Sequence, residues 1–327
     1  MPPGQLDRSV SLIESVTTQT TYAFLFPACG FVQKFFETRF HKHLQNENAL
    51  GCTVDKDRLL PGITAVVLTM NGRRLLDRCL ASLAFCEHIL CVDSGSSDTT
   101  KEICDAHGAE FISNAWQGFA AQFTFAQTKV KTRWLFIVDQ DEICPEPLAR
   151  AISAAVAEAD ALADTPADAC TAFSVGRTSW YFDRFMKHGG WHPDHILRVF
   201  RTGEVTFSQD AHIHYHPSGR TAHVGGPNAE LIHYPYTGFF HQLEKLNTYA
   251  EQGAESLRAG GKKGGVLRGI LHGWARFLRI YVIKLGFLDG RAGFLAACHG
   301  SFYAFSKYVR EAEASWGAPY DWDKQKK

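Results

Sequence analysis

Short apolar runs alternate with longer segments of helical periodicity between residues 62 and 163. Apolar or β-branched runs, which predict buried strands, occur at 63–69, 88–93, 109–113 and 134–139. The intervening and following segments predict helices at 73–86, 96–108, 118–131 and 145–163. Strands and helices that alternate across short connections predict an α/β fold. Its Rossmann-like central sheet would be mostly parallel, with flanking helices.

The alternation loosens beyond residue 165. Apolar runs at 168–182 and 195–207 predict more strands, the His- and Gly-rich stretch 212–241 predicts loops, and the chain from 242 is helical. We therefore expect three parts: an N-terminal arm at 1–60, an α/β domain at 61–241 and a helical, amphipathic region at 242–327. In the α/β part, ligands are expected at the carboxyl ends of the strands.

The composition narrows the class of protein. The chain has 327 residues, 45% hydrophobic and 21% charged, which is typical of a folded globular protein. Its formal net charge of zero argues against a diffusely basic nucleic-acid binder, so we expect no nucleic-acid partner. Nine cysteines without a C-x-x-C pair predict reduced, buried thiols. Because no signal peptide or long uncharged apolar run is visible, we expect a cytoplasmic protein.

Acidic residues follow the strand predicted at 134–139. In "WLFIVDQDE", Asp139 and Asp141 lie at the tip of this strand. Carboxylates this close repel each other unless a cation neutralises them, and Mg²⁺ or Mn²⁺ prefers such oxygen ligands and commonly bridges to phosphates. The pattern therefore indicates a metal site that holds a diphosphate. The alternative is an acidic turn that caps the helix starting near Pro145.

Two neighbouring strand ends carry polar residues as well. Asp93 ends the strand at 88–93, and Gly95 after it permits a tight turn beside a ligand. Thr69 and Asn71 follow the first strand. Helix capping by Ser97 or Asp98 explains the loop after Asp93 but not Asp93 itself. We expect these side chains to meet the acidic pair at one edge of the sheet.

Together these motifs resemble the inverting nucleotide-sugar glycosyltransferases of family 2, which have the GT-A fold. The matching pieces are "AVVLTMNGRRLLDRCLASL", "ILCVDSGSSDTT" and "WLFIVDQDE". The later pieces "KHGGWHPDHILRVFR", "ELIHYPY" and "YVIKLGFLDGRAGF" are similar to a bacterial branch that adds glucose or a related sugar to the lipopolysaccharide inner core. The resemblance covers about 62–310.

The resemblance implies a nucleotide-sugar donor, preferably a UDP-sugar, bound with Mg²⁺ or Mn²⁺. It assigns donor contacts to Thr69, Asn71, Asp93, Gln122 and Asp139. Among these, Asp93 would bind uracil or ribose, and Asp139 would lie near the ribose and the donor sugar. Asp141 would bind the metal on the diphosphate.

Inverting transfer also needs a general base on the acceptor side. Asp194 in "HPDHILRVFR" is our candidate, with Trp191 and Arg198 beside the acceptor. The segment resembles the family pattern E-D-x-x-L-x-R, but Pro193 replaces the first acid and the Arg comes one residue early. Alternatively, Asp194 is a turn residue that pairs with Arg198.

Six histidines lie within thirty residues: His212, His214, His216, His223, His233 and His241. A strand "HIHYH" would aim the first three to one side, where they could bind zinc. We prefer His214 as a residue that approaches the metal or the acceptor. A zinc hydrolase built on this cluster, a metal-dependent nucleotidyltransferase and a non-catalytic lipid-binding protein are the alternatives.

The segment 261–294 predicts a basic amphipathic helix with Trp and Tyr. One face carries apolar residues and another carries arginines, and Asp289 alone is acidic. We expect this segment to lie on the inner face of the plasma membrane, where a lipid-linked saccharide acceptor of lipopolysaccharide biosynthesis would be presented. The alternative is a helix whose apolar stripe packs on the catalytic domain.

Overall fold

The computed structural model describes residues 60–162, 170–209, 213–313 and 315–316. All but the last residue of the N-terminal arm predicted at 1–60 therefore lies outside the described residues, as does His212. The first half alternates as predicted. Its strands are β1 (Leu60–Thr69), β2 (Cys86–Asp93), β3 (Glu110–Ser113) and β4 (Trp134–Asp139), and its helices are α3 (Leu76–Ser82), α4 (Thr100–Ala106), α5 (Phe119–Gln127) and α6 (Glu146–Ala161).

Strands β3, β2, β1 and β4 lie side by side in that order and are all parallel. The register pairs Thr69 with Asp93 and Leu68 with Asp139. The predicted strand ends therefore lie at one edge of the sheet, because parallel neighbours in register finish together.

Both faces of this sheet are covered. Phe136 of β4 belongs to a buried cluster with Leu80 of α3 and Leu148 of α6. Ile137, its neighbour in sequence, points to the other face and belongs to a cluster with Phe123 of α5. Such continuous burial explains why β4 reads as an uninterrupted apolar run.

The second half of the sheet is mixed. Its strands are β5 (Glu142–Ile143), β6 (Cys170–Tyr181), β7 (Arg184–Phe185), β8 (Asp194–Arg201), β11 (Arg220–Val224) and β12 (Glu230–His233). Strand β8 lies antiparallel between β4 and β6, and β6 pairs in parallel with β11 and β12. Strands β9 (Val205–Gln209) and β10 (Ile213–Pro217) form a separate hairpin.

The prediction of loops at 212–241 is wrong, since β10, β11 and β12 lie within this range. These strands are only four or five residues long. In β10, half-buried Ile213 and Tyr215 alternate with exposed His214 and His216. A short strand with a polar outer face has little apolar signal, which is why the sequence pattern hid it.

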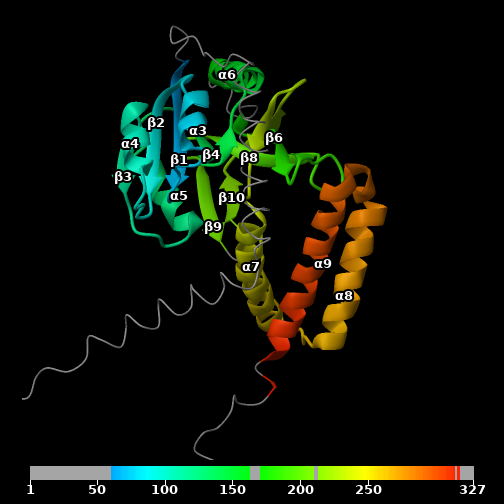
Figure 1. The fold of residues 1–327 in the computed structure, drawn as a ribbon. Helices are drawn as coiled ribbons and strands as arrows, with labels where there is room; N and C mark the ends of the chain where they lie inside the picture. Colours follow the sequence, from blue (N-terminus) through cyan, green and yellow to red (C-terminus); the bar gives the residue numbers. More distant parts are fainter. Residues whose placement is uncertain (1–59, 163–169, 210–212, 314, 317–327) are drawn as a thin grey trace, which may run out of the picture. The chain divides into compact units, whose positions relative to one another are not determined.

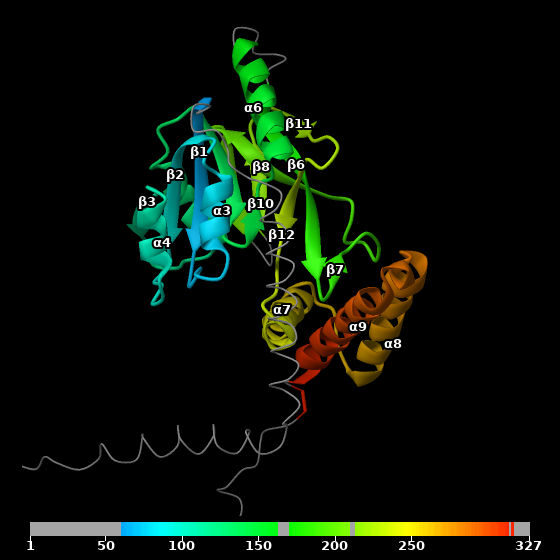
Figure 2. The ribbon, with the colours of Figure 1, turned by 45° about the horizontal axis from the view of Figure 1, so that its top comes forward.

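Helices form the C-terminal part, as expected from 242 onward. They are α7 (Phe239–Ala259), α8 (Val266–Leu278), the π-helical turn η2 (Arg279–Ile283), the 3₁₀ turn η3 (Gly286–Asp289) and α9 (Gly290–Glu313). Helices α8 and α9 lie side by side in both views (Figures 1 and 2). A Cβ built on Gly269 would lie 3.0 Å from the carbonyl oxygen of Phe305, so glycine allows this close packing.

The packing turns the apolar face of α8 outward. Its buried residues are Gly269 and Gly273, whereas Leu267 and Trp274 are 69% and 61% exposed. The alternative in which the apolar stripe packs on the catalytic domain is therefore wrong for the described chain. Within that same part of the chain, none of the helices combines the length and the hydrophobicity needed to span a bilayer.

Candidate active site

A cleft of about 1270 Å³ opens at the carboxyl edge of the sheet. Predicted site residues that line it are Thr69, Asp139, Asp141, Trp191, Asp194 and Arg198. These residues come from segments that are far apart in the sequence, and the fold brings them to one cleft, as the motifs predicted. Asn71, Asp93, Gln122 and His214, which were also predicted, are not among the lining residues.

Asp139 is held by a buried arginine. Arg198 Nη2 lies 2.5 Å from Asp139 Oδ2 and 2.8 Å from Glu142 Oε1, and the Arg198 side chain is only 5% exposed. Glu142 Oε2 in turn accepts a hydrogen bond from the Asp139 backbone N–H at 3.1 Å. Burial raises the pKa of Asp139, but the charge and hydrogen bond of Arg198, together with the charges of other nearby groups such as Arg177, hold the pKa below its usual value. Arg198 is thus buried against the carboxylates of Asp139 and Glu142, which does not favour its predicted contact with the acceptor.

Arg177 extends this network to Asp194. Its Nη1 lies 3.1 Å from Glu142 Oε1, and its Nε and Nη2 lie 2.9 and 2.8 Å from Asp194 Oδ2. Asp139, Arg198, Glu142, Arg177 and Asp194 therefore form one chain of alternating charges. Asp194 pairs with Arg177, so the alternative pairing with Arg198 is wrong. The Asp194 side chain is 34% exposed and lines the cleft.

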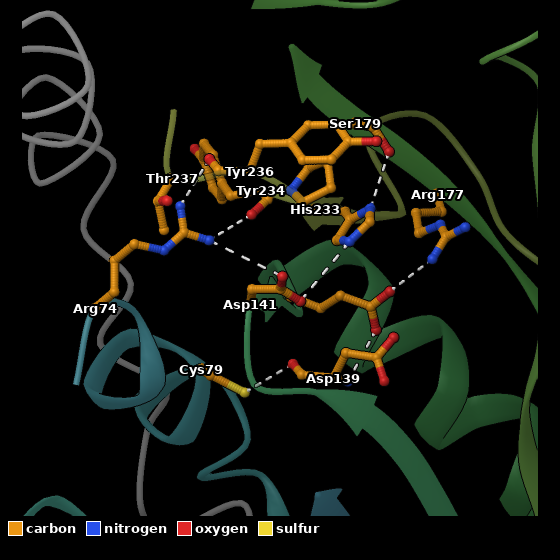
Figure 3. Close-up of polar contacts among 12 residues, drawn as sticks. Arg74, Cys79, Asp139, Asp141, Arg177, Ser179, His233, Tyr234, Tyr236 and Thr237 are labelled. Carbon is orange, nitrogen blue, oxygen red and sulfur yellow. Dashed lines mark hydrogen bonds and ion pairs between the residues drawn. The ribbon is translucent and has the colours of Figure 1, made fainter. Parts of the chain in front are cut away.

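Asp141 lies between a histidine and an arginine (Figure 3). Its Oδ1 is 3.7 Å from His233 Nε2, and its Oδ2 is 3.9 Å from Arg74 Nη2. Arg74 also donates hydrogen bonds to the backbone carbonyls of Tyr234 and Tyr236, at 2.5 and 3.0 Å. The guanidinium is therefore anchored to the segment after β12 and stands at one side of the carboxylate.

Burial sets the protonation of this pair. It raises the pKa of Asp141 and lowers the pKa of His233 to about 4, so the imidazole is neutral at pH 7. His233 Nδ1 lies 3.1 Å from Ser179 Oγ. When Nδ1 donates to that hydroxyl, Nε2 presents its lone pair toward Asp141.

The pair fits an incomplete site for a hard divalent cation. Asp141 supplies a carboxylate oxygen and His233 a neutral nitrogen, both of which bind Mn²⁺. No group of three or more candidate ligands occurs among the described residues. Such a partial set suits Mg²⁺ or Mn²⁺, which keep waters and bind substrate phosphates.

His214 is not placed to join this site. It lies on β10 with an exposed side chain, and its neighbours Ile213 and Tyr215 line the cleft instead. Side chains alternate along a strand, so His214 points away from the cleft. The geometry of the described histidines therefore supports neither His214 as a metal ligand nor the zinc-hydrolase alternative.

Asp93 organises the loop beside the cleft. Its Oδ1 accepts hydrogen bonds from Thr69 Oγ1 at 2.9 Å and from Ser96 Oγ at 2.5 Å. Its Oδ2 accepts from the backbone N–H groups of Gly95 and Ser96, at 2.9 and 2.8 Å. Burial raises the pKa of Asp93, but these hydrogen bonds outweigh it and lower the pKa. Both oxygens of the Asp93 carboxylate therefore already accept hydrogen bonds from groups of the protein.

Asn71 and Gln122 have similar internal partners. Asn71 adopts a left-handed φ of 49°, and its Oδ1 accepts a hydrogen bond from Ser97 N–H at 2.9 Å. Gln122 is fully buried, donates to the Asn114 carbonyl at 2.9 Å and lies 3.2 Å from Ser94 Oγ. Ser94 lines the cleft. Gln122 therefore positions the cleft wall rather than facing a ligand.

Three residues of this site were not predicted individually from the sequence: Arg177, Glu142 and His233. A charged residue inside an apolar strand, such as Arg177 in "SVGRTSWYF", is itself a signal of a buried ion pair. Glu142 directly follows the acidic pair. No local pattern distinguishes His233 from the other histidines, because its place depends on the pairing of β12 with β5 and β6.

The known proteins to which this chain is similar in sequence are glycosyltransferases. The sequence model of the family described as "Glycosyl transferase family 2" matches residues 64–216. The chain is 26% identical over 255 residues to the lipopolysaccharide core biosynthesis glycosyltransferase LpsC of Rhizobium meliloti (strain 1021), covering 74% of this chain and 89% of LpsC. An uncharacterized glycosyltransferase of Rickettsia bellii is 22% identical over 259 residues, covering 77% of this chain and 85% of that protein.

Two solved structures are similar at a lower level. The crystal structure of S. aureus TarS 1–349 in complex with UDP-GlcNAc has a TM-score of 0.39 and 11% identity, over 78% of this chain and 92% of that one. Glucosyl-3-phosphoglycerate synthase from Mycobacterium tuberculosis, in complex with Mn²⁺, UDP and glucosyl-3-phosphoglycerate, has a TM-score of 0.39 and 14% identity. That match covers 65% of this chain and 87% of the other.

Proposed function

Since the chain belongs to glycosyltransferase family 2, we propose that it has the GT-A fold and transfers a sugar from a nucleotide-sugar donor to a lipid-linked saccharide, with inversion. The observation that carries this proposal is one cleft lined by Asp139, Asp141 and Asp194, with an exposed apolar helix face on the same unit of the protein. A UDP-sugar is the donor that the family resemblance implies.

The donor would lie at the carboxylate end of the cleft. Mg²⁺ or Mn²⁺ held by Asp141 and His233 would neutralise charge on the leaving diphosphate. Asp139, kept ionised by Arg198, is the group we assign to the ribose and the donor sugar. Thr69 lines the cleft beside it, and its hydroxyl fixes Asp93.

Asp194 is the proposed general base. Its carboxylate would take the proton from an acceptor hydroxyl as that oxygen bonds to the anomeric carbon and the bond to the diphosphate breaks on the opposite face. Arg177 binds Asp194 Oδ2 through two nitrogens, which fixes the direction of the carboxylate. Trp191 also lines the cleft and would supply an apolar surface for a sugar ring.

We propose that 61–241 is the catalytic domain and that 242–327 attaches the enzyme to the inner face of the plasma membrane. Leu267, Leu271 and Trp274 are all at least 60% exposed on α8. An apolar face of this kind beside basic residues is typical of helices that lie in a membrane interface. The similarity to LpsC supports an acceptor from lipopolysaccharide core biosynthesis.

Calorimetric titration with UDP-, GDP-, ADP- and dTDP-glucose, each with and without Mn²⁺, tests the donor assignment. We expect one nucleotide to bind, and Mn²⁺ to strengthen its binding. Absence of binding by all four, in the presence of Mn²⁺, would contradict the proposed function.

A further inference from the structure

The end of the cleft formed by the C-terminal helices is cationic. Arg276 of α8, Arg279 of η2 and Lys284 line it, together with Ile280 and His299. In the part of the chain that the structure describes, no carboxylate forms an ion pair with any of these three cations. The arginines at the other end of the cleft differ, because Arg177 and Arg198 are neutralised by buried acids.

This cationic end is built by close backbone contacts. Gly189 and Gly190 have φ values of 67° and 84°, and Gly189 N–H donates to the Lys284 carbonyl at 2.8 Å. A Cβ on Gly190 would lie 2.8 Å from Lys284 Cδ, so glycine gives the lysine its room. The same loop is held by Asp289, whose Oδ2 accepts from His188 N–H at 2.7 Å.

The cations also border the exposed apolar face. Ile283 and Leu285 flank Lys284 and are 73% and 46% exposed, and Trp274 precedes Arg276 by two residues. When a lipid-linked molecule enters the cleft from this face, the part of it that adjoins the lipid would lie next to Arg276, Arg279 and Lys284. Unpaired arginine and lysine side chains in a cleft are suited to bind phosphate.

We propose that Arg276, Arg279 and Lys284 bind a phosphate group of the acceptor, so that the acceptor is a phosphorylated glycolipid. This inference rests on the proposed function, because it requires the acceptor to occupy the same cleft as the donor. The phosphate lies on the acceptor side of the cleft, away from the carboxylates that take the donor.

The test uses glucose 6-phosphate as the probe and glucose as its uncharged counterpart, each titrated into the full-length protein saturated with UDP and Mn²⁺. The variant R276Q/R279Q removes two cations of the cleft. The matched control K262Q/K263Q removes two exposed cations of the same helical region that do not line it. We expect the sugar phosphate, and not glucose, to bind the unmodified protein, and its apparent Kd to rise about tenfold or more in R276Q/R279Q alone.

UDP affinity in the presence of Mn²⁺ should be the same in all three proteins. Equal binding of the sugar phosphate to all three, or none to the unmodified protein, overturns the inference while UDP binding leaves the proposed function intact. The other possible source of phosphate is the lipid headgroup. Binding of the same proteins to vesicles of phosphatidylcholine and phosphatidylglycerol tests this source. If R276Q/R279Q weakens vesicle binding more than the control and leaves sugar-phosphate binding unchanged, the cations bind lipid headgroups and the inference is wrong.

Discussion

Glu142 accepts a hydrogen bond from Arg198 at 2.8 Å, and the two side chains are 0% and 5% exposed. Glu142 also binds Arg177, so one buried carboxylate connects the arginine at Asp139 with the arginine at Asp194. Asp139, which we assign to the sugar donor, and Asp194, the proposed base, therefore belong to one ionic network. They lie 55 positions apart in the sequence.

Glu142→Gln should lower the free energy of unfolding by about 3 kcal/mol, because it leaves the buried Arg198 and the half-buried Arg177 without a shared counter-charge. Urea denaturation measures this value. Glu146→Gln is the control, since Glu146 forms an exposed pair with Arg150 that should be worth less than about 1 kcal/mol. Equal losses in the two variants would show that the buried network contributes little.

Asp141→Asn and His233→Gln should each remove the gain in donor affinity that Mn²⁺ provides, because they delete the proposed oxygen and nitrogen ligands. We expect donor binding with Mn²⁺ to weaken about tenfold or more, and binding without metal to change little. Calorimetry with and without Mn²⁺ separates the two effects. An undiminished Mn²⁺ effect in both variants would place the metal elsewhere.

Asp194→Asn should leave donor affinity within about twofold and reduce the transfer rate by about 10² to 10⁴, the usual contribution of a general base. Transfer of radiolabelled sugar to a membrane extract measures the rate. If transfer continues at near the original rate, Asp194 serves only as the partner of Arg177, and the base lies elsewhere in the cleft.

Replacing Leu271 and Trp274 by Ser should weaken binding to phosphatidylglycerol-containing vesicles at least tenfold, because burial of each large apolar side chain contributes about 1.5–3 kcal/mol. Vesicle co-sedimentation measures the effect. Leu162→Ser is the control, since Leu162 follows α6 and is 43% exposed. The membrane assignment requires that this control bind as the unmodified protein does.

Asp93→Asn should destabilise the protein by about 2 kcal/mol at pH 7, through weaker hydrogen bonds from Ser96, Gly95 and Thr69. The folded-state pKa of Asp93 is lowered, so its stabilisation is complete above the unfolded value of about 3.9 and is lost as the pH falls through the folded pKa. The difference in free energy of unfolding between the two proteins should therefore be constant from pH 7 to 5 and shrink below about pH 4. A difference that stays constant to pH 3 would contradict this cause.

The parallel half of the fold could be predicted because its signals are local. Strand β4 reads as an apolar run that ends at Asp139, and parallel pairing alone brings Asp139 and Asp93 to one edge. The metal-side histidine could not be predicted, because His214 and His233 differ only in long-range strand pairing. Likewise, the partner of Asp194 follows from the pairing of Arg177 with Asp194 across β6 and β8.

The glycine contact between α8 and α9 also has a consequence for handling the protein. Because Gly269 and Gly273 face inward, no other element in the described part of the chain covers the apolar side of α8. An apolar surface of this kind tends to self-associate in plain buffer. We expect the purified chain to stay monodisperse only in mild detergent or bound to nanodiscs.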